Sequence, residues 1–293
     1  MSRFKKGDIV GRISYNKDVI FEITNIIKTS NKEIYILKGI TERIEADSPP
    51  EDLQIMDKRI VNKKMKLIED KILNRIEKCI RNEGYNIRKR NNLFNFSDIG
   101  KRSARIISTG KILHLDGDKR YSTKSMKYYK SLGLNAIVKN IPENKQAIVI
   151  KSLLDRYNPD ILVLTGHDGM IRKGTDFNDI YNYRNSRHFI NTVNEARKWN
   201  RQKAKDLAIF AGACQSYYEA IMSAGANFAS SPKRIMIDFI DPLIVAERIA
   251  MTENTKYLTI RDIEEELRDG RDGVDGIGSI GKKIIKIESW VRN

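Results

Sequence analysis

The sequence predicts an α/β protein, a three-layer sandwich with a mostly parallel sheet, preceded by a small β-barrel. From Ile106 onward, short apolar runs alternate with segments of helical spacing, which is typical of a parallel sheet. Residues 1–57 instead hold short alternating strands separated by turns. Two apolar runs of the later part end in His167 and Cys214. Because open α/β folds build their sites at the carboxyl ends of strands, we expect both side chains at one edge of the sheet.

The chain divides into three segments. With 293 residues, 40% of them hydrophobic, it can bury a full core and still hold a second, smaller module. We predict an SH3- or KOW-like barrel over 1–57, a basic helix and linker over 58–105, and the α/β domain over 106–293. The strands of the barrel are expected at 8–14, 19–27, 33–37 and 43–46.

The middle segment changes character at Asn82. From Lys58 to Asn82 the apolar residues recur at helical spacing among many lysines and arginines, which predicts one basic amphipathic helix. Residues 83–105 are mostly polar and predict either a linker or a weakly packed pair of strands.

Strands and helices then alternate along the α/β domain. The predicted strands lie at 111–115, 135–138, 160–166, 206–213 and 234–239, and the predicted helices at 120–132, 142–157, 186–203, 215–223, 242–251 and 259–267. The last apolar run, 284–290, alternates and predicts an edge strand. The segment from Gly276 to Gly281 matches G-x-G-x-x-G, but no predicted strand leads into it, so we expect a flexible loop near the site and no dinucleotide.

Composition excludes several classes of protein. No apolar leader follows Met1, and no run approaches the roughly 18 apolar residues of a membrane span, so an intracellular protein without a membrane partner is expected. The two cysteines, Cys79 and Cys214, give neither a disulfide framework nor a metal-ligand spacing, so neither a metal nor a cofactor is predicted. The formal net charge of +16 fits either a solvated basic face or a surface for an acidic partner.

The order of His167 and Cys214 along the chain narrows the chemistry. A thiolate is a strong nucleophile, and an imidazole exchanges protons near neutral pH. Papain-like peptidases and glutamine amidotransferases place the cysteine before the histidine, whereas all three histidines here precede Cys214. Caspase-like peptidases place the histidine roughly 50 residues upstream of the cysteine, as in this chain. We expect the other two histidines, His114 and His188, to be structural.

The neighbours of both residues favour acyl transfer. Small residues precede Cys214, and a helix expected from Gln215 would point its positive end at the sulfur and lower the thiol pKa. The backbone N–H of Cys214 is the first predicted oxyanion donor. Glycines flank the His167–Asp168 pair, and the N–H of Gly169 is the second predicted donor.

Two sequence blocks carry a resemblance to a known family. The blocks Leu-Thr-Gly-His-Asp-Gly, which ends at Gly169, and Ala-Gly-Ala-Cys-Gln-Ser, which starts at Ala211, resemble the signature blocks of the caspase-like clan of cysteine peptidases. The likeness also covers the N-terminal barrel and the segment 226–232, so that the whole chain resembles the YabG family of sporulation-specific peptidases. The resemblance implies a caspase-like α/β domain with His167 and Cys214 as its catalytic dyad.

The resemblance also implies substrates and a location. It implies an endopeptidase of the mother-cell cytoplasm, or of the spore coat, that trims spore coat and germination-related proteins. Basic-specific members of the clan suggest cleavage after Arg, which requires a carboxylate in the S1 pocket. The candidates by position are Asp168, Asp176, Asp179 and Asp238. The basic runs 88–90 and 101–105 are candidate sites of self-cleavage.

A second class of function stays open from the residues alone. A barrel of this type, a basic helix and a positive net charge also fit a nucleic-acid-binding or scaffold protein in which Cys214 is an ordinary core residue. That interpretation leaves the strand-end positions of His167 and Cys214 unexplained. A salt-sensitive nucleic-acid complex that is unaffected by Cys214→Ala would favour it.

Overall fold

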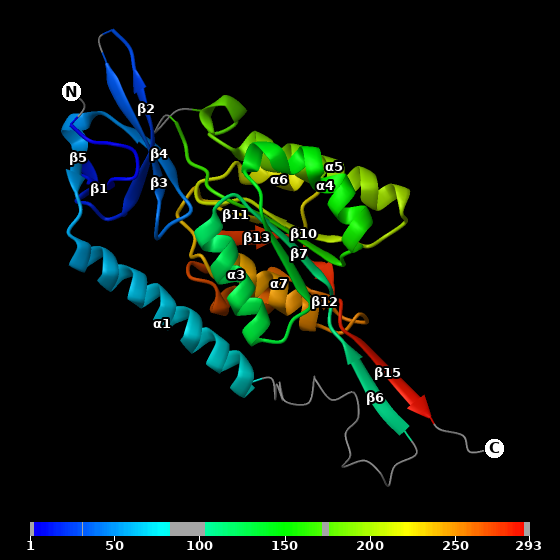
Figure 1. The fold of residues 1–293 in the computed structure, drawn as a ribbon. Helices are drawn as coiled ribbons and strands as arrows, with labels where there is room; N and C mark the ends of the chain where they lie inside the picture. The colour runs from blue at the N-terminus through cyan, green and yellow to red at the C-terminus, as the bar shows by residue number, and fades with distance from the viewer. Residues whose placement is uncertain (1–2, 31, 83–102, 172–175, 290–293) are drawn as a thin grey trace.

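The computed structural model describes residues 3–30, 32–82, 103–171 and 176–289 (Figure 1). The chain begins with a five-stranded antiparallel sheet of order β4-β3-β2-β1-β5. Its strands are β1 (Ile9–Arg12), β2 (Phe21–Lys28), β3 (Glu33–Gly39), β4 (Glu45–Ser48) and β5 (Leu53–Ile55). Alternate residues of these strands, such as Val10, Ile23 and Leu37, are fully buried and give this sheet its own core.

The later part of the chain forms a six-stranded central sheet of order β13-β11-β10-β9-β7-β8. All neighbouring pairs are parallel except β11 and β13, which run antiparallel. The strands are β7 (Ile112–Asp116), β8 (Ala136–Asn140), β9 (Ile161–Thr165), β10 (Ala208–Ala211), β11 (Phe228–Ser230) and β13 (Val274–Gly276). Residues of β7, β9 and β10 are fully buried, as expected for parallel strands covered on both faces. A mixed α/β fold with a largely parallel sheet is therefore confirmed.

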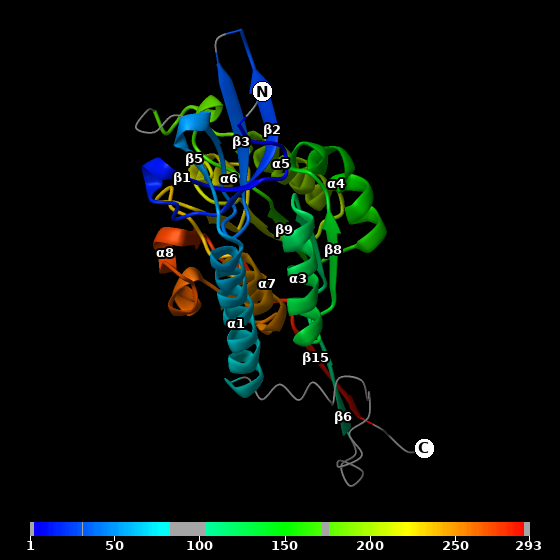
Figure 2. The same cartoon turned by 60° about the vertical axis from the view of Figure 1, so that its left-hand side comes forward.

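Helices cover both faces of the central sheet (Figures 1 and 2). One face packs against α4 (Glu143–Tyr157), α5 (Ser186–Gln202) and α6 (Tyr218–Ser223), and the other against α3 (Lys119–Ser131) and α7 (Asp241–Met251). The long helix α1 (Lys58–Asn82) leaves the N-terminal sheet and runs beside α3, where Ile72 and Ile76 are buried. The predicted basic helix over residues 58–82 is thus confirmed.

Smaller elements complete the fold. They are β6 (Ser103–Ser108), β12 (Tyr257–Leu258), the short helix α8 (Gly270–Gly273), β14 (Ser279–Ile280) and β15 (Ile284–Ser289). Strands β6 and β15 pair antiparallel and form a ribbon that projects from the central sheet in Figure 1. The strand predicted at 284–290 is therefore present over Ile284–Ser289, and its partner is β6 and not the central sheet.

Three other predicted elements differ from the structure. Residues 234–239 form no strand, because this segment turns toward the centre of the molecule and accepts single bonds, such as the one from Gln215 N–H to Ile235 O (3.1 Å). The predicted helix at 259–267 is two short 3₁₀ turns, since the chain breaks at Ile263, whose φ is −135°. The segment 276–281 includes residues of β13 and β14 and is not a flexible loop.

Within the described residues, no helix is long and apolar enough to cross a membrane. The candidate cleavage run 88–90 lies outside the described residues, and of the run 101–105 only the last three residues, in β6, are described.

The central strands should dominate stability. Leu162 of β9 is fully buried, so Leu162→Ala should lower the free energy of unfolding by about 2–5 kcal/mol. Ile148 of α4 is 72% exposed, and Ile148→Ala is the matched control with a change near zero. Chemical denaturation followed by circular dichroism measures both. Equal losses for the two variants would contradict this packing of the sheet.

Candidate active site

Three neighbouring strands end at one edge of the central sheet and bring polar residues together there. Strand β7 ends in Asp116, β9 is followed by His167, and β10 by Cys214. The parallel register aligns Asp116 with Thr165 of β9. Because the carboxyl ends of parallel strands meet at the same edge, the sheet itself gathers these side chains.

A loop of the N-terminal sheet enters this edge. Residues 40–44 join β3 to β4, and the loop carries Arg43, whose side chain is fully buried. Arg43 Nη1 donates to Asp116 Oδ2 over 2.5 Å. The guanidinium carbon lies 4.5 Å from the ring centre of Tyr121 and 5.3 Å from that of Phe239. A carboxylate and two aromatic faces therefore form a fitted pocket for an arginine side chain.

The carboxylate of Asp116 is held in place from its own side. Oδ2 accepts the hydroxyl of Thr165 (2.8 Å), and Oδ1 accepts the N–H of Asp118 (2.8 Å). The buried imidazole of His114 in turn contacts Thr165 Oγ1 at 2.7 Å. Burial would raise the pKa of Asp116, but Arg43, His114 and the N–H of Asp118 outweigh burial and lower the pKa. Asp116 is thus a fixed anion, and His114 supports it as a structural residue.

The main chain of Arg43 is bound as closely as its side chain. Its carbonyl oxygen accepts the N–H of Cys214 (3.3 Å) and the N–H of Asp168 (3.3 Å). The N–H of Gly169 instead donates to the carboxylate of Asp168 (2.9 Å). Two converging N–H donors at one carbonyl oxygen are the geometry of an oxyanion hole. The structure thus places the N–H groups of Cys214 and Asp168 at this carbonyl, whereas the N–H of Gly169, the second donor suggested by the sequence, bonds elsewhere.

The carboxylate of Asp168 joins the two loops that carry these donors. It is fully buried and accepts hydrogen bonds from the hydroxyls of Ser186 (2.5 Å) and Ser216 (2.9 Å) and from the N–H of Asn185 (2.8 Å). Burial raises the pKa of Asp168 to about 6, despite these bonds. The side chain of Asp168 thus binds residues of the α/β part and does not contact Arg43.

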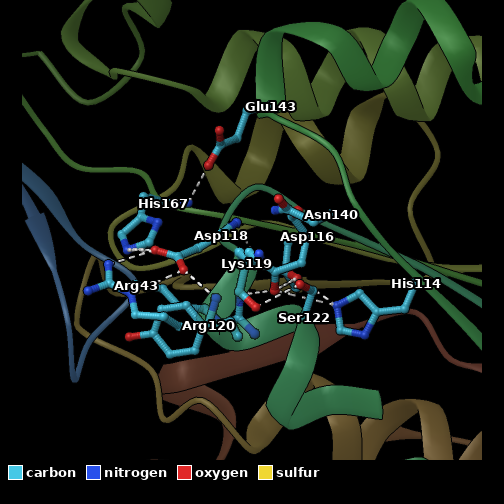
Figure 3. Close-up of polar contacts among 12 residues, drawn as sticks. Arg43, His114, Asp116, Asp118, Lys119, Arg120, Ser122, Asn140, Glu143 and His167 are labelled. Carbon is cyan, nitrogen blue, oxygen red and sulfur yellow. Dashed lines mark hydrogen bonds and ion pairs between the residues drawn. The ribbon is translucent and has the colours of Figure 1, made fainter. Parts of the chain in front are cut away.

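The imidazole of His167 lies near Arg43 (Figure 3). Its Nε2 lies 2.9 Å from the carbonyl oxygen of Gly39, which can only accept, so Nε2 carries the proton. Its backbone N–H donates to Glu143 (2.7 Å), and Asp118 Oδ2 lies 4.0 Å from Nε2. Its Nδ1 has no hydrogen-bond partner among the described residues. Burial, above all, lowers the pKa of His167 to about 4, so the ring is neutral at pH 7 and Nδ1 holds a lone pair.

Cys214 is fully buried between the loop and the segment before α7. Its sulfur lies 3.8 Å from the carbonyl oxygen of Ile237, and burial raises the pKa of the thiol to about 12. The helix expected at Gln215 begins only at Tyr218 and has six residues. The prediction that a helix N-terminus lowers this thiol pKa is therefore wrong, because Gln215 adopts a left-handed conformation (φ 56°) that delays the helix.

The other predicted carboxylates have partners other than Arg43. Asp176 and Asp179 accept backbone N–H groups within their own turns, from Asn178 and Tyr181. Asp238 forms an ion pair with Lys71 of α1 at 3.2 Å. His188 lies in the first turn of α5, two residues after Ser186, and its side chain is partly exposed.

Sequence reasoning missed Asp116 and Arg43. A signal for Asp116 was present, because it directly follows a buried strand of the same parallel sheet as His167. Arg43 gave none, since a residue at the start of a short predicted strand in the N-terminal sheet says nothing about a partner 73 positions away, at Asp116.

A buried thiol, a neutral imidazole and two converging N–H donors beside an arginine pocket can together perform acyl transfer on a peptide carbonyl. The family model described as YabG peptidase U57 matches residues 5–287. The chain is also 36% identical over 262 residues to the sporulation-specific protease YabG of Bacillus subtilis (strain 168), covering 89% of this chain and 90% of that protein. The chain therefore belongs to the YabG family and is a peptidase.

The burial of His167 makes a direct prediction about its charge. NMR titration of the folded Cys214→Ala chain should keep the His167 ring neutral down to about pH 4, because burial disfavours the charged form. His167→Gln assigns the signal, and the same chain in urea should titrate near 6.5. A titration near 6.5 in the folded chain would mean that the site is open to water.

Proposed function

We propose that this peptidase is a cysteine endopeptidase that cleaves after arginine, with Cys214 as nucleophile and His167 as general acid and base. The observation that carries the proposal is Arg43. Its side chain pairs with Asp116 while its carbonyl oxygen accepts two N–H groups, one of them from Cys214. Arg43 therefore sits as the P1 residue of a substrate would.

The pocket around Arg43 supports arginine as the preferred P1 residue. Asp116 is a buried anion with no exposed surface, so a neutral P1 side chain would leave its charge unpaired. The rings of Tyr121 and Phe239 stack on each other at 5.4 Å and face the guanidinium. A planar guanidinium uses such faces better than an ammonium group does, which favours Arg over Lys. In this proposal Asp116 takes the role that the sequence alone suggested for Asp168, Asp176, Asp179 or Asp238.

The mechanism follows from the groups around the carbonyl. The thiol of Cys214 loses its proton to Nδ1 of His167, and the sulfur adds to the P1 carbonyl carbon. The N–H groups of Cys214 and Asp168 hold the oxyanion, and His167 then protonates the leaving amine. Water hydrolyses the thioester in the second half of the reaction. The bond from His167 Nε2 to Gly39 O supports this assignment, because it leaves Nδ1 as the atom that exchanges protons.

The family supports a role in sporulation. We propose that the chain acts in the mother-cell cytoplasm or on the spore coat and trims coat and germination-related proteins. The sheet order supports a caspase-like α/β domain, since the histidine and the cysteine follow the adjacent parallel strands β9 and β10. The five-stranded antiparallel sheet supports an SH3-like N-terminal domain over 1–57.

The alternative of a nucleic-acid-binding or scaffold protein is not favoured. The peptidase family model spans residues 5–287, which includes the N-terminal sheet and α1 as well as the α/β part. Under the alternative, the contacts of Cys214 N–H and Asp168 N–H with one carbonyl oxygen would have no purpose.

Removal of either proposed catalytic side chain should abolish cleavage. Cys214→Ala and His167→Ala, with folding checked by circular dichroism, should each cut an unfolded arginine-rich protein at least 10³-fold more slowly than the wild type. His188→Ala is the control, because it removes a partly exposed histidine that has no role in the proposed mechanism, and it should keep the wild-type rate. Cleavage that persists in folded Cys214→Ala would exclude the cysteine mechanism.

Asp116 should set the preference for arginine. Wild-type enzyme should cleave a peptide with P1 arginine far faster than the same peptide with citrulline, its neutral isostere. In Asp116→Asn the ratio of the two kcat/KM values should fall about 10–100-fold, because a charge-assisted hydrogen bond is lost. Asp176→Asn and Asp179→Asn are matched controls that keep the ratio. An unchanged ratio in folded Asp116→Asn would reject this S1 pocket.

A further inference from the structure

The loop that carries Arg43 is held closed at both ends. Gly39 N–H donates to Ile44 O (2.8 Å), and a Cβ atom on Gly39 would lie 2.2 Å from the carbonyl oxygen of Glu42. Ile40 is fixed as well, because its carbonyl accepts the hydroxyl of Tyr121 (3.1 Å). The turn is therefore tight, and it holds one arginine in one position.

The chain beyond Arg43 continues along the site as a bound peptide would. Ile44 forms a parallel bridge with Asp168, and Glu45 N–H donates to Asp168 O over 2.7 Å. Backbone pairing of this kind is how peptidases and other proteins hold extended peptides. The Arg43–Ile44 bond thus lies where the bond to be cut would lie, between the arginine pocket and a segment paired with the loop after β9.

The same loop excludes every other substrate. Arg43 fills the pocket of Asp116, and Arg43, His167 and Cys214 are all fully buried. Burial also keeps both reactive groups neutral, since the thiol pKa is raised to about 12 and the pKa of His167 is lowered to about 4. A protein substrate can enter only after the loop has left.

We propose that the Arg43–Ile44 bond is a self-processing site, the first bond that the enzyme cuts, and that its cleavage opens the active site. The inference rests on the proposed cysteine mechanism and names its first substrate as the enzyme's own β3–β4 loop. This cleavage site differs from the candidate sites in the basic runs 88–90 and 101–105, because Arg43 is already bound in the arginine pocket.

The chemistry balances as an ordinary peptide hydrolysis. The sulfur of Cys214 bonds to the Arg43 carbonyl carbon, and the thiol proton passes through His167 to the nitrogen of Ile44 as the C–N bond breaks. Water then attacks the thioester, which restores the thiol and leaves a carboxylate on Arg43. The products are a new carboxyl end at Arg43 and a new amino end at Ile44. The turn that held Arg43 is then open, whereas β3 keeps its pairing to β2 on one side and to β4 on the other.

A purely structural role for Arg43 makes opposite predictions. If Arg43 only ties the N-terminal sheet to the α/β part, the Arg43–Ile44 bond stays intact and its loss cannot raise activity. The self-processing proposal requires the cut and a faster onset of activity without Arg43.

The experiment follows newly made chain over time. Wild-type protein from cell-free translation is sampled at intervals, its fragments are identified by mass spectrometry, and cleavage of a P1-arginine reporter peptide is recorded in parallel. We expect a fragment that begins at Ile44, a lag in reporter cleavage of matching length, and a first-order rate unchanged on 100-fold dilution. Cys214→Ala should stay intact, also when mixed with active enzyme, because its Arg43 is buried.

Variants at Arg43 complete the test. Arg43→Ala should lack both the Ile44 fragment and the lag, and Arg43→Lys, which keeps the charge beside Asp116, should be cut more slowly with a longer lag. Arg12→Ala is the matched control, because Arg12 forms an ion pair with Asp52 (2.8 Å) in the same sheet and should behave as wild type. If the wild-type protein cleaves the reporter while its Arg43–Ile44 bond stays intact, the self-processing proposal is overturned and the proposed function still stands. Loss of reporter cleavage in every variant would count against the proposed function itself.

Discussion

The ion pair between Arg43 and Asp116 is the interaction on which the rest of the structure depends. Both side chains are fully buried, and the two charges meet at 2.5 Å. Removing charges from water costs several kcal/mol for each ion, which only close pairing and further hydrogen bonds offset. Thr165 and the N–H of Asp118 supply those bonds on the side of Asp116, and the two aromatic rings cover the guanidinium. The N-terminal sheet is thereby fixed to the edge of the central sheet.

This constraint explains why the site is closed in the structure. With Arg43 in place, the loop covers His167 and Cys214, and the carbonyl oxygen of Gly39, at the end of β3, accepts the N–H of the imidazole. Burial leaves the thiol of Cys214 and the imidazole of His167 both neutral. The N–H groups of Cys214 and Asp168, the proposed oxyanion donors, still converge on one carbonyl oxygen, and the carboxylate of Asp168 holds the surrounding loops through Ser186 and Ser216.

Sequence patterns could predict the scaffold of the site and not its closure. The apolar runs before His167 and Cys214 identify parallel strands, and parallel strands place their carboxyl ends together whatever the loops do. The direction of a backbone N–H depends on the local turn. The sequence position of Gly169 beside His167 therefore could not show that its N–H donates to the Asp168 carboxylate. The pocket required a contact between Arg43 and Asp116, which no local pattern records. The apolar segment 234–239 was wrongly predicted as a strand for a similar reason. Phe239 packs against Arg43, and the carbonyl of Ile237 contacts Cys214, whereas a strand would pair in the sheet.

The most direct test of the account is covalent labelling with a peptide chloromethyl ketone that ends in arginine. The account predicts one adduct on Cys214 by mass spectrometry, no adduct on the chain's other cysteine, Cys79, and at least 10-fold slower labelling by the citrulline analogue. Equal labelling of both cysteines, or equal rates with arginine and citrulline, would contradict an arginine pocket beside a catalytic thiol.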